Sequence, residues 1–227
     1  MTSKDFVATA LNIASLNTAY AKGTFGNKYT IPFIKQKTAQ YPSFYTNSEL
    51  AYLSGKAQNG TLYLFDCCGL IKSIIWNFPD MKYASNGMRD CNDQGIWDEY
   101  CINKSTDFNN IIPGEIVHIK GHVGIYVGNY QVVEATNRWS RNVLISTFKY
   151  NEGSHNRLWD AHGKLKLLDY GSETEAPEIH ITYTVRKGDT LSKIAAIHHM
   201  TWEELWKRNP EIKNPNLIYP GQCIIIR

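Results

Sequence analysis

The chain has 227 residues, 43% of them hydrophobic, and a formal net charge of +3. This length allows one core of ordinary domain size and one small core. Basic residues nowhere gather as densely as nucleic-acid binding requires, and no apolar run reaches the length of a membrane span, so neither nucleic acid nor a bilayer span is expected.

The N-terminal residues predict an amphipathic helix and not a signal peptide, because polar residues interrupt the apolar ones. Ser3 is the expected cap of this helix. Residues 33–64 are polar and aromatic, with a short helix expected at 48–53. The inward face of the N-terminal helix is expected to hold Phe6, Ala10, Leu11 and Ile13.

A more apolar helix is predicted for residues 67–78, where apolar side chains recur at helical spacing and Pro79 ends the run. Cys67 lies in its first turn, directly after Asp66. Asp66 can cap the helix, and the backbone N–H groups and the helix dipole there favour a thiolate. This environment suits an activated nucleophile, although a small buried thiol at a helix start gives the same pattern.

Two alternating β patterns span 113–129, and a third follows at 132–136 beyond a turn signal. In the strand that starts at His122, the odd-numbered apolar residues share one face, whereas His122 and Gly124 share the other. The glycine leaves room beside the histidine, which suits a base that faces a substrate and equally suits an exposed histidine. His118, between apolar neighbours, is expected to be structural.

Further strands are expected at 142–147, 157–159 and 165–168, and a short helix within 81–110. Residues 1–170 therefore predict an α+β domain, with helices packed on an antiparallel sheet of five or six strands. Residues 171–180, with three acidic residues and a proline, are predicted to be a linker. Residues 181–227 follow the order strand, helix, helix, strand, which is typical of a small separate domain.

Five cysteines lie at positions 67, 68, 91, 101 and 223. Their odd number excludes a complete disulfide framework. They also lack Cys-x-x-Cys spacing, so no zinc or other metal site and no cofactor is expected. Pairing of Cys91 with Cys101 in an oxidising compartment stays open.

Three motifs occur in order: Asp66-Cys67-Cys68-Gly69-Leu70, then Pro-Gly-Glu-Ile-Val at 113–117, then Gly-His-Val-Gly-Ile-Tyr-Val-Gly-Asn at 121–129. Over residues 60–136 this resembles the NlpC-type cysteine peptidases, papain-like enzymes that cut bacterial peptidoglycan. The resemblance implies Cys67 as nucleophile, His122 as general base and Glu134 as third catalytic residue. Cys68 stands where the family commonly has serine, and the position of Asp66 assigns the nucleophile to Cys67.

Strand register decides between Glu134 and Asn137 as the third residue. With a simple two-residue turn, Glu134 would lie across from Ile125, and Asn137 would lie across from His122. A longer loop or a bulge would bring Glu134 onto the face of the histidine. Family members usually have histidine or another polar residue here, and a glutamate can fill the same role. Motif position favours Glu134.

The segment from Tyr20 to Gly26 resembles the aromatic and glycine loop that lies beside the nucleophile in this family. This implies that the Tyr20 hydroxyl contacts the substrate or helps the oxyanion. A plain core tyrosine is the alternative.

Tyr-Thr-Val-x-x-Gly-Asp-Thr-Leu, with Asn209-Pro210 and Pro220-Gly221-Gln222, resembles the LysM module over residues 183–227. In that family a shallow groove takes N-acetylglucosamine of peptidoglycan or chitin. A helix cap is the alternative for Asp189, and core positions are the alternative for Leu191 and Ile218; both roles can hold at once. The implied groove residues are Gly188, Asp189, Thr190 and Leu191 on one side, and Asn216, Leu217 and Ile218 on the other.

Together the resemblances imply a peptidoglycan hydrolase, a cysteine endopeptidase that cleaves a stem-peptide amide while LysM holds the glycan. The expected bond is the γ-D-glutamyl to diamino acid link. The alternatives are an N-acetylmuramoyl-L-alanine amidase, a non-catalytic wall-binding protein and a papain-like acyltransferase. A wall enzyme without an export signal suggests a phage or prophage endolysin, made in the cytoplasm and released to the cell wall through a separate pore-former, a holin.

Overall fold

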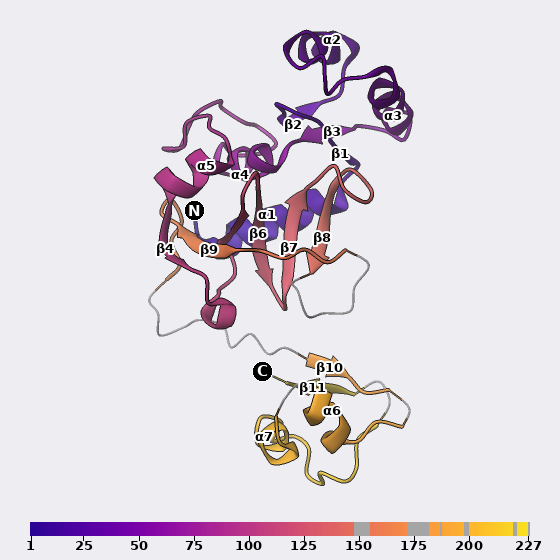
Figure 1. The fold of residues 1–227 in the computed structure, drawn as a ribbon, viewed down its shortest axis with the longest axis vertical. Coiled ribbons are helices and arrows are strands. Elements are labelled where there is room, and N and C mark those ends of the chain that lie inside the picture. The colour runs from indigo at the N-terminus through magenta and orange to yellow at the C-terminus, as the bar shows by residue number, and fades with distance from the viewer. Residues whose placement is uncertain (148–154, 172–181, 187, 198–199, 220–221, 227) are drawn as a thin grey trace. The chain divides into compact units, whose positions relative to one another are not determined.

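Figure 1 shows the computed structural model, which describes residues 1–147, 155–171, 182–186, 188–197, 200–219 and 222–226. The chain divides into two compact units, Met1–Glu173 and Thr174–Arg227. This boundary falls within the predicted linker 171–180, of which residues 172–180 lie outside the described residues. Among the described residues, no helix combines the length and the apolar character that crossing a bilayer requires.

The first unit mixes helices with two sheets. Its helical segments are α1 (Ser3–Ser15), α2 (Ile31–Gln40), α3 (Asn47–Ala57), α4 (Cys67–Ile75), α5 (Asp93–Gly95), the π-helical turn η1 (Ile96–Tyr100) and the 3-10 turn η2 (Phe108–Asn110). Its strands are β1 (Thr18–Tyr20), β2 (Phe25–Lys28), β3 (Tyr63–Phe65), β4 (Cys101–Ser105), β5 (Ile116–Ile119), β6 (His122–Gly128), β7 (Gln131–Ala135), β8 (Val143–Thr147) and β9 (Ala161–Leu165).

The main sheet is antiparallel and has six strands in the order β4-β9-β5-β6-β7-β8. Helices α1 and α4 pack on β6 and β7, and α1 runs behind the sheet in the view of Figure 1. The predicted alternation of β6 is confirmed, because Val123 and Ile125 belong to the large core under these helices while Tyr126 belongs to a smaller core of the unit. The sheet thus separates two apolar layers.

Helix α4 is buried along its whole length, since all of its residues have little exposed surface. It ends at Ile75, slightly before the predicted end at 78. Gly69 explains how α4 comes so close to the β1–β2 segment: a Cβ added at Gly69 would lie 1.9 Å from the carbonyl oxygen of Thr24. A side chain there would push the first turn of α4, and with it Cys67, away from its neighbours.

A smaller three-stranded sheet, ordered β1-β3-β2, lies beside α4. Strand β1 runs parallel to β3, whereas β2 runs antiparallel to it. Helices α2 and α3 lie next to this sheet in Figure 1, and their buried residues Ile34 and Leu53 share an apolar core with Leu64 of β3. Helix α3 includes the helix predicted at 48–53, whereas α2 was not predicted.

Several local predictions for the first unit are wrong. Thr2 and not Ser3 caps α1, because its hydroxyl accepts from the Asp5 N–H at 3.1 Å. Leu11 is 38% exposed, while the other three predicted inward residues of α1 are buried. The strands predicted at 157–159 and 165–168 are replaced by β9, which starts after the first and shares only Leu165 with the second. Its sequence, Ala-His-Gly-Lys-Leu, has no clear alternation and therefore does not predict a strand.

The second unit has the predicted order of strand, helix, helix and strand. Strands β10 (Thr182–Thr184) and β11 (Cys223–Ile225) pair antiparallel, and α6 (Leu191–Ile197) packs on α7 (Trp202–Lys207). The buried side-chain amide of Asn209 links helix α7 to strand β11. It donates to the carbonyls of Leu205 and Ile225 at 2.7 and 2.6 Å and accepts from the Ile225 N–H. This network explains the asparagine of the Asn-Pro motif.

Candidate active site

Cys67 lies at the N-terminus of α4, where Asp66 is the helix cap. The Asp66 carboxylate accepts from the Gly69 N–H at 2.6 Å and from the Gly23 N–H at 2.9 Å, so it fixes both the first turn of α4 and the loop after β1. Burial and the negative charge of Cys67 raise the pKa of Asp66 to about 6. The expected cap is therefore present.

The two neighbouring thiols have opposite electrostatics. Their sulfur atoms lie 3.8 Å apart. Hydrogen bonds from Cys68 and His122, the positive charge of His122 and the Val123 backbone N–H hold the pKa of Cys67 well below its ordinary value, although burial opposes them. The bond to Cys67, together with burial, raises the pKa of Cys68. The directions of these two pKa shifts favour the thiolate on Cys67, with Cys68 as the hydrogen-bond donor between the two sulfur atoms.

His122 lies between Cys67 and an acidic side chain. Its Nε2 lies 2.6 Å from Oε2 of Glu134, whose side chain is fully buried, and Cys67 is the other group that acts on the charge of the histidine. Burial alone would lower the pKa of His122, but its contacts with Cys67 and Glu134 raise it to about 9. The same contact with His122 lowers the pKa of Glu134 against the effect of burial. The directions of the three pKa shifts favour a row of charged groups in which Cys67 is a thiolate, His122 an imidazolium and Glu134 a carboxylate.

A β-bulge brings Glu134 beside His122. Tyr126 pairs with Val132 and Gly128 with Gln131, so Val127 is an extra residue in β6. This shift moves Glu134 from the position across from Ile125 to the face of the histidine. The alternative residue, Asn137, is exposed and lies beyond the end of β7.

Two residues that support this row were not singled out from the sequence. The Arg157 Nε donates to both carboxylate oxygens of Glu134, at 3.1 and 2.9 Å, and its Nη2 donates to Thr136 at 3.1 Å. The Trp159 ring stacks on His122 with centroids 5.6 Å apart and planes 13° apart. Trp159 also fills the room beside Gly124, where an added Cβ would lie 3.1 Å from the indole.

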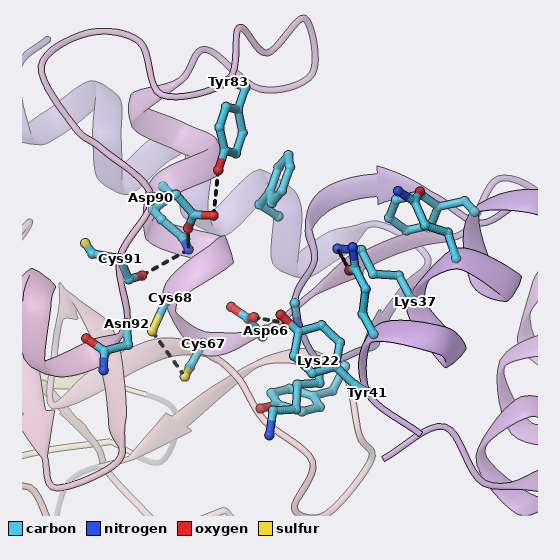
Figure 2. A pocket seen from close by; sticks show the side chains of 17 residues that line it. Lys22, Lys37, Tyr41, Asp66, Cys67, Cys68, Tyr83, Asp90, Cys91 and Asn92 are labelled. Carbon is cyan, nitrogen blue, oxygen red and sulfur yellow. Dashed lines mark hydrogen bonds and ion pairs between the residues drawn. The ribbon is translucent and has the colours of Figure 1, made fainter. Parts of the chain in front are cut away.

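A cavity of about 1030 Å³ opens at the sulfur atoms. Its walls come from β1 and the loop that follows, from α2, from the start of α4 and from residues 83–92. Tyr20 lines it, and burial raises the pKa of this phenol, so the hydroxyl stays protonated beside Cys67. Figure 2 shows Cys67 and Cys68 between Asp90, Cys91 and Asn92 on one side and Lys22, Lys37 and Tyr41 on the other.

Two further histidines and two further cysteines of the first unit lie outside the row of Cys67, His122 and Glu134. His118 stacks on Trp97 with ring centroids 4.7 Å apart, and burial lowers its pKa. His162 forms an ion pair with Glu115, and its other ring nitrogen lies 2.9 Å from the Asp107 carbonyl oxygen. Cys91 and Cys101 are free thiols. The part of the chain that the structure describes contains no group of three or more His, Cys, Asp or Glu residues able to hold a metal ion.

In the second unit, the residues predicted for the glycan groove have different environments. Thr190 and not Asp189 caps α6, since its hydroxyl accepts from the Lys193 N–H at 3.2 Å. Asp189 instead fixes the preceding turn by accepting from the Arg186 N–H and the Tyr183 hydroxyl. The Leu191 side chain is buried in the core, and Ile218 packs against that core. The exposed members of the set are Gly188, Thr190, Asn216 and Leu217.

Comparison with known proteins identifies the C-terminal unit. Residues 183–227 match the family model of the LysM domain, a peptidoglycan-binding domain. The endolysin of Bacillus phage PZA is 45% identical over 51 residues, which are 22% of this chain and 20% of that protein. The endolysin of Bacillus phage B103 is 50% identical over 54 residues, which are 23% of this chain and 20% of that protein.

A protein of a different kind matches as well. Chlorophenol reductase of Desulfitobacterium hafniense is 53% identical over 45 residues, which are 20% of this chain and 14% of that protein. The chain thus covers a fifth or less of the length of these relatives, and the endolysin matches lie in the LysM region. The LysM match and the two endolysins support a LysM-containing protein associated with the cell wall.

Proposed function

We propose that residues 1–173 form a papain-like cysteine peptidase domain of NlpC type, which hydrolyses an amide in the stem peptide of peptidoglycan while the LysM domain holds the glycan. The observation that carries this proposal is the row of Cys67, His122 and Glu134, in which the thiol of Cys67 lines an open cavity. An unperturbed thiol, with a pKa of about 8.5, is only a few per cent ionised at neutral pH, and this row supplies the missing activation.

The proposed reaction has two stages. The Cys67 thiolate attacks the amide carbonyl, and the oxyanion is stabilised by backbone N–H groups at the start of α4 and by the Tyr20 hydroxyl. His122 protonates the leaving amine, which leaves a thioester on Cys67. His122 then takes a proton from water, the resulting hydroxide releases the carboxylic acid product, and the thiolate is regenerated. Glu134 keeps the imidazole oriented throughout.

We propose the γ-D-glutamyl to diamino acid bond as the one that is cut. Purified sacculi would be digested and the soluble fragments analysed by mass spectrometry. New amino termini on the diamino acid are the expected result. Free amino groups on L-alanine would instead identify an N-acetylmuramoyl-L-alanine amidase, and transfer to an added amine would identify an acyltransferase.

A matched pair of variants tests the role of the nucleophile. Cys67→Ala should abolish fragment release and leave wall binding intact, whereas Cys68→Ala should keep measurable hydrolysis, because the proposed role of the Cys68 thiol is limited to a hydrogen bond with Cys67. Equal release by wild type and Cys67→Ala would identify a non-catalytic wall-binding protein. Release through a holin, as in a phage or prophage endolysin, stays a prediction from the sequence.

A further inference from the structure

The cavity beside Cys67 has an uneven distribution of charge. Three lysines line it: Lys22, Lys37 and Lys72. Lys72 is neutralised, because its Nζ forms an ion pair with Asp90 and also donates to the Cys91 carbonyl at 3.1 Å. Among the described residues, Lys22 and Lys37 form no ion pair with an acidic side chain. The α2 side of the cavity therefore carries two unneutralised cations.

Aromatic rings hold both cations at the cavity wall. The Lys22 Nζ lies 5.7 Å from the centroid of the Tyr41 ring, and the Lys37 Nζ lies 5.9 Å from the same centroid and 5.5 Å from that of Phe33. Gln40 accepts a further hydrogen bond from Lys37 at 3.1 Å. These contacts restrict two long side chains that would otherwise be free on the surface.

Tyr41 links the cations to the nucleophile. Its ring packs so closely on Gly23 that an added Cβ would lie 2.4 Å from it, and Gly23 in turn donates to Asp66, the cap of the helix that begins at Cys67. Lys37 is half-buried, and burial lowers its pKa. A partly buried cation in a fixed place favours an anionic partner at contact distance, and among the described residues no acidic side chain forms an ion pair with Lys37.

We infer that Lys22 and Lys37 bind a carboxylate of the substrate, the free α-carboxylate of the D-glutamyl residue whose γ-carbonyl Cys67 attacks. This inference rests on the proposed function. In a γ-glutamyl amide, three carbons separate that carboxylate from the reacting carbonyl, so both groups enter the same cavity. The two lysines thereby distinguish walls with free D-glutamate from walls in which this carboxylate is amidated, because an amide is neutral and cannot pair with them.

The test uses the full chain and two soluble muropeptides that differ only at this group, one with D-glutamate and one with D-isoglutamine. We expect wild type to prefer the free carboxylate by roughly tenfold in kcat/KM, the effect of one charge-assisted contact. The double variant Lys22→Gln/Lys37→Gln should reduce this ratio to about one, and Lys22→Arg/Lys37→Arg should keep it. Lys35→Gln, an exposed change on the same helix outside the cavity, is the charge-matched control and should keep the full ratio.

The outcomes separate this inference from the proposed function. Equal hydrolysis of both muropeptides by wild type, or an unchanged ratio in the double variant, would overturn the inference and leave the peptidase assignment in place. Failure of wild type to hydrolyse either muropeptide or sacculi would overturn the proposed function itself. If the double variant shows no thermal unfolding transition, the single variant Lys22→Gln, at an exposed position, is used in its place. Its ratio of kcat/KM for the two muropeptides should fall, and an unchanged ratio would overturn the inference.

Discussion

At the scale of single residues, the electrostatics of His122 set the expected pH range of the proposed reaction. Cys67 ionises below its ordinary pKa, and the pKa of His122 is raised to about 9, so the thiolate and imidazolium coexist between these two values. We expect kcat/KM to fall as the pH rises through about 9, when the imidazolium loses its proton. Measured initial rates across this range check the alkaline limb; a fall centred near the ordinary histidine pKa would contradict it.

Glu134→Gln tests the source of this shift. The variant keeps an acceptor for His122 but removes the charge that helps to raise its pKa. The alkaline limb should therefore move to lower pH, and kcat should fall by about a hundredfold or more, in the range of general acid–base contributions. Asn137→Ala, an exposed change, is the control. If the alkaline limb of Glu134→Gln coincided with that of wild type, Glu134 would not be the group that raises the pKa of His122.

Arg157 is expected to act as a positioning residue through Glu134. Its guanidinium bridges Glu134 and Thr136, a geometry that an ammonium cannot reproduce. Arg157→Gln should lower kcat about tenfold with little change in KM, since the row loses order while the cavity is unchanged. Arg157→Lys should restore only part of the loss. Separate measurement of kcat and KM is required, and a rise in KM alone would instead indicate contact with substrate.

At the scale of elements, the features that the sequence predicts correctly are those determined by residues close together in the chain. The first turn of α4 was predictable because Asp66, Cys67 and Gly69 act within four residues of each other. The bulge at Val127 was not, because it depends on how β6 pairs with β7. Arg157 and Trp159 reach the site from a loop just before β9, a strand whose polar sequence gives no alternation. The features that could not be predicted from the sequence therefore depend on pairing between strands that are distant along the chain.

The fit of α4 against the β1–β2 segment gives a prediction for stability. Gly69→Ala would place a Cβ 1.9 Å from a backbone oxygen that cannot move aside easily, and we expect it to lower the free energy of unfolding by about 3 kcal/mol. Gly55→Ala, in α3, has no atom within 4 Å of the added Cβ and should raise stability by up to about 1 kcal/mol. Urea unfolding compares the two, and equal midpoints for Gly69→Ala and wild type would show that α4 can shift.

At the scale of the whole molecule, the division after Glu173 separates the unit proposed to carry out hydrolysis from the LysM unit. The row of catalytic candidates and the cavity lie in residues 1–173, and the LysM match lies in residues 183–227. Each unit has its own apolar core. A chain that ends at Glu173 should therefore fold and hydrolyse soluble muropeptides with a kcat/KM close to that of the full chain.

The same truncated chain should lose most of its activity on intact sacculi. Attachment through LysM raises the local concentration of the catalytic unit near the stem peptides. In linked systems this raises the apparent affinity by about a hundredfold or more. Pelleting with purified sacculi measures binding, and fragment release measures hydrolysis on the same sample. Full-length Cys67→Ala is the complementary control, because it should pellet with the wall and release nothing. If the truncated chain lost activity on soluble muropeptides as well, LysM would be needed for the catalytic unit itself and not only for attachment.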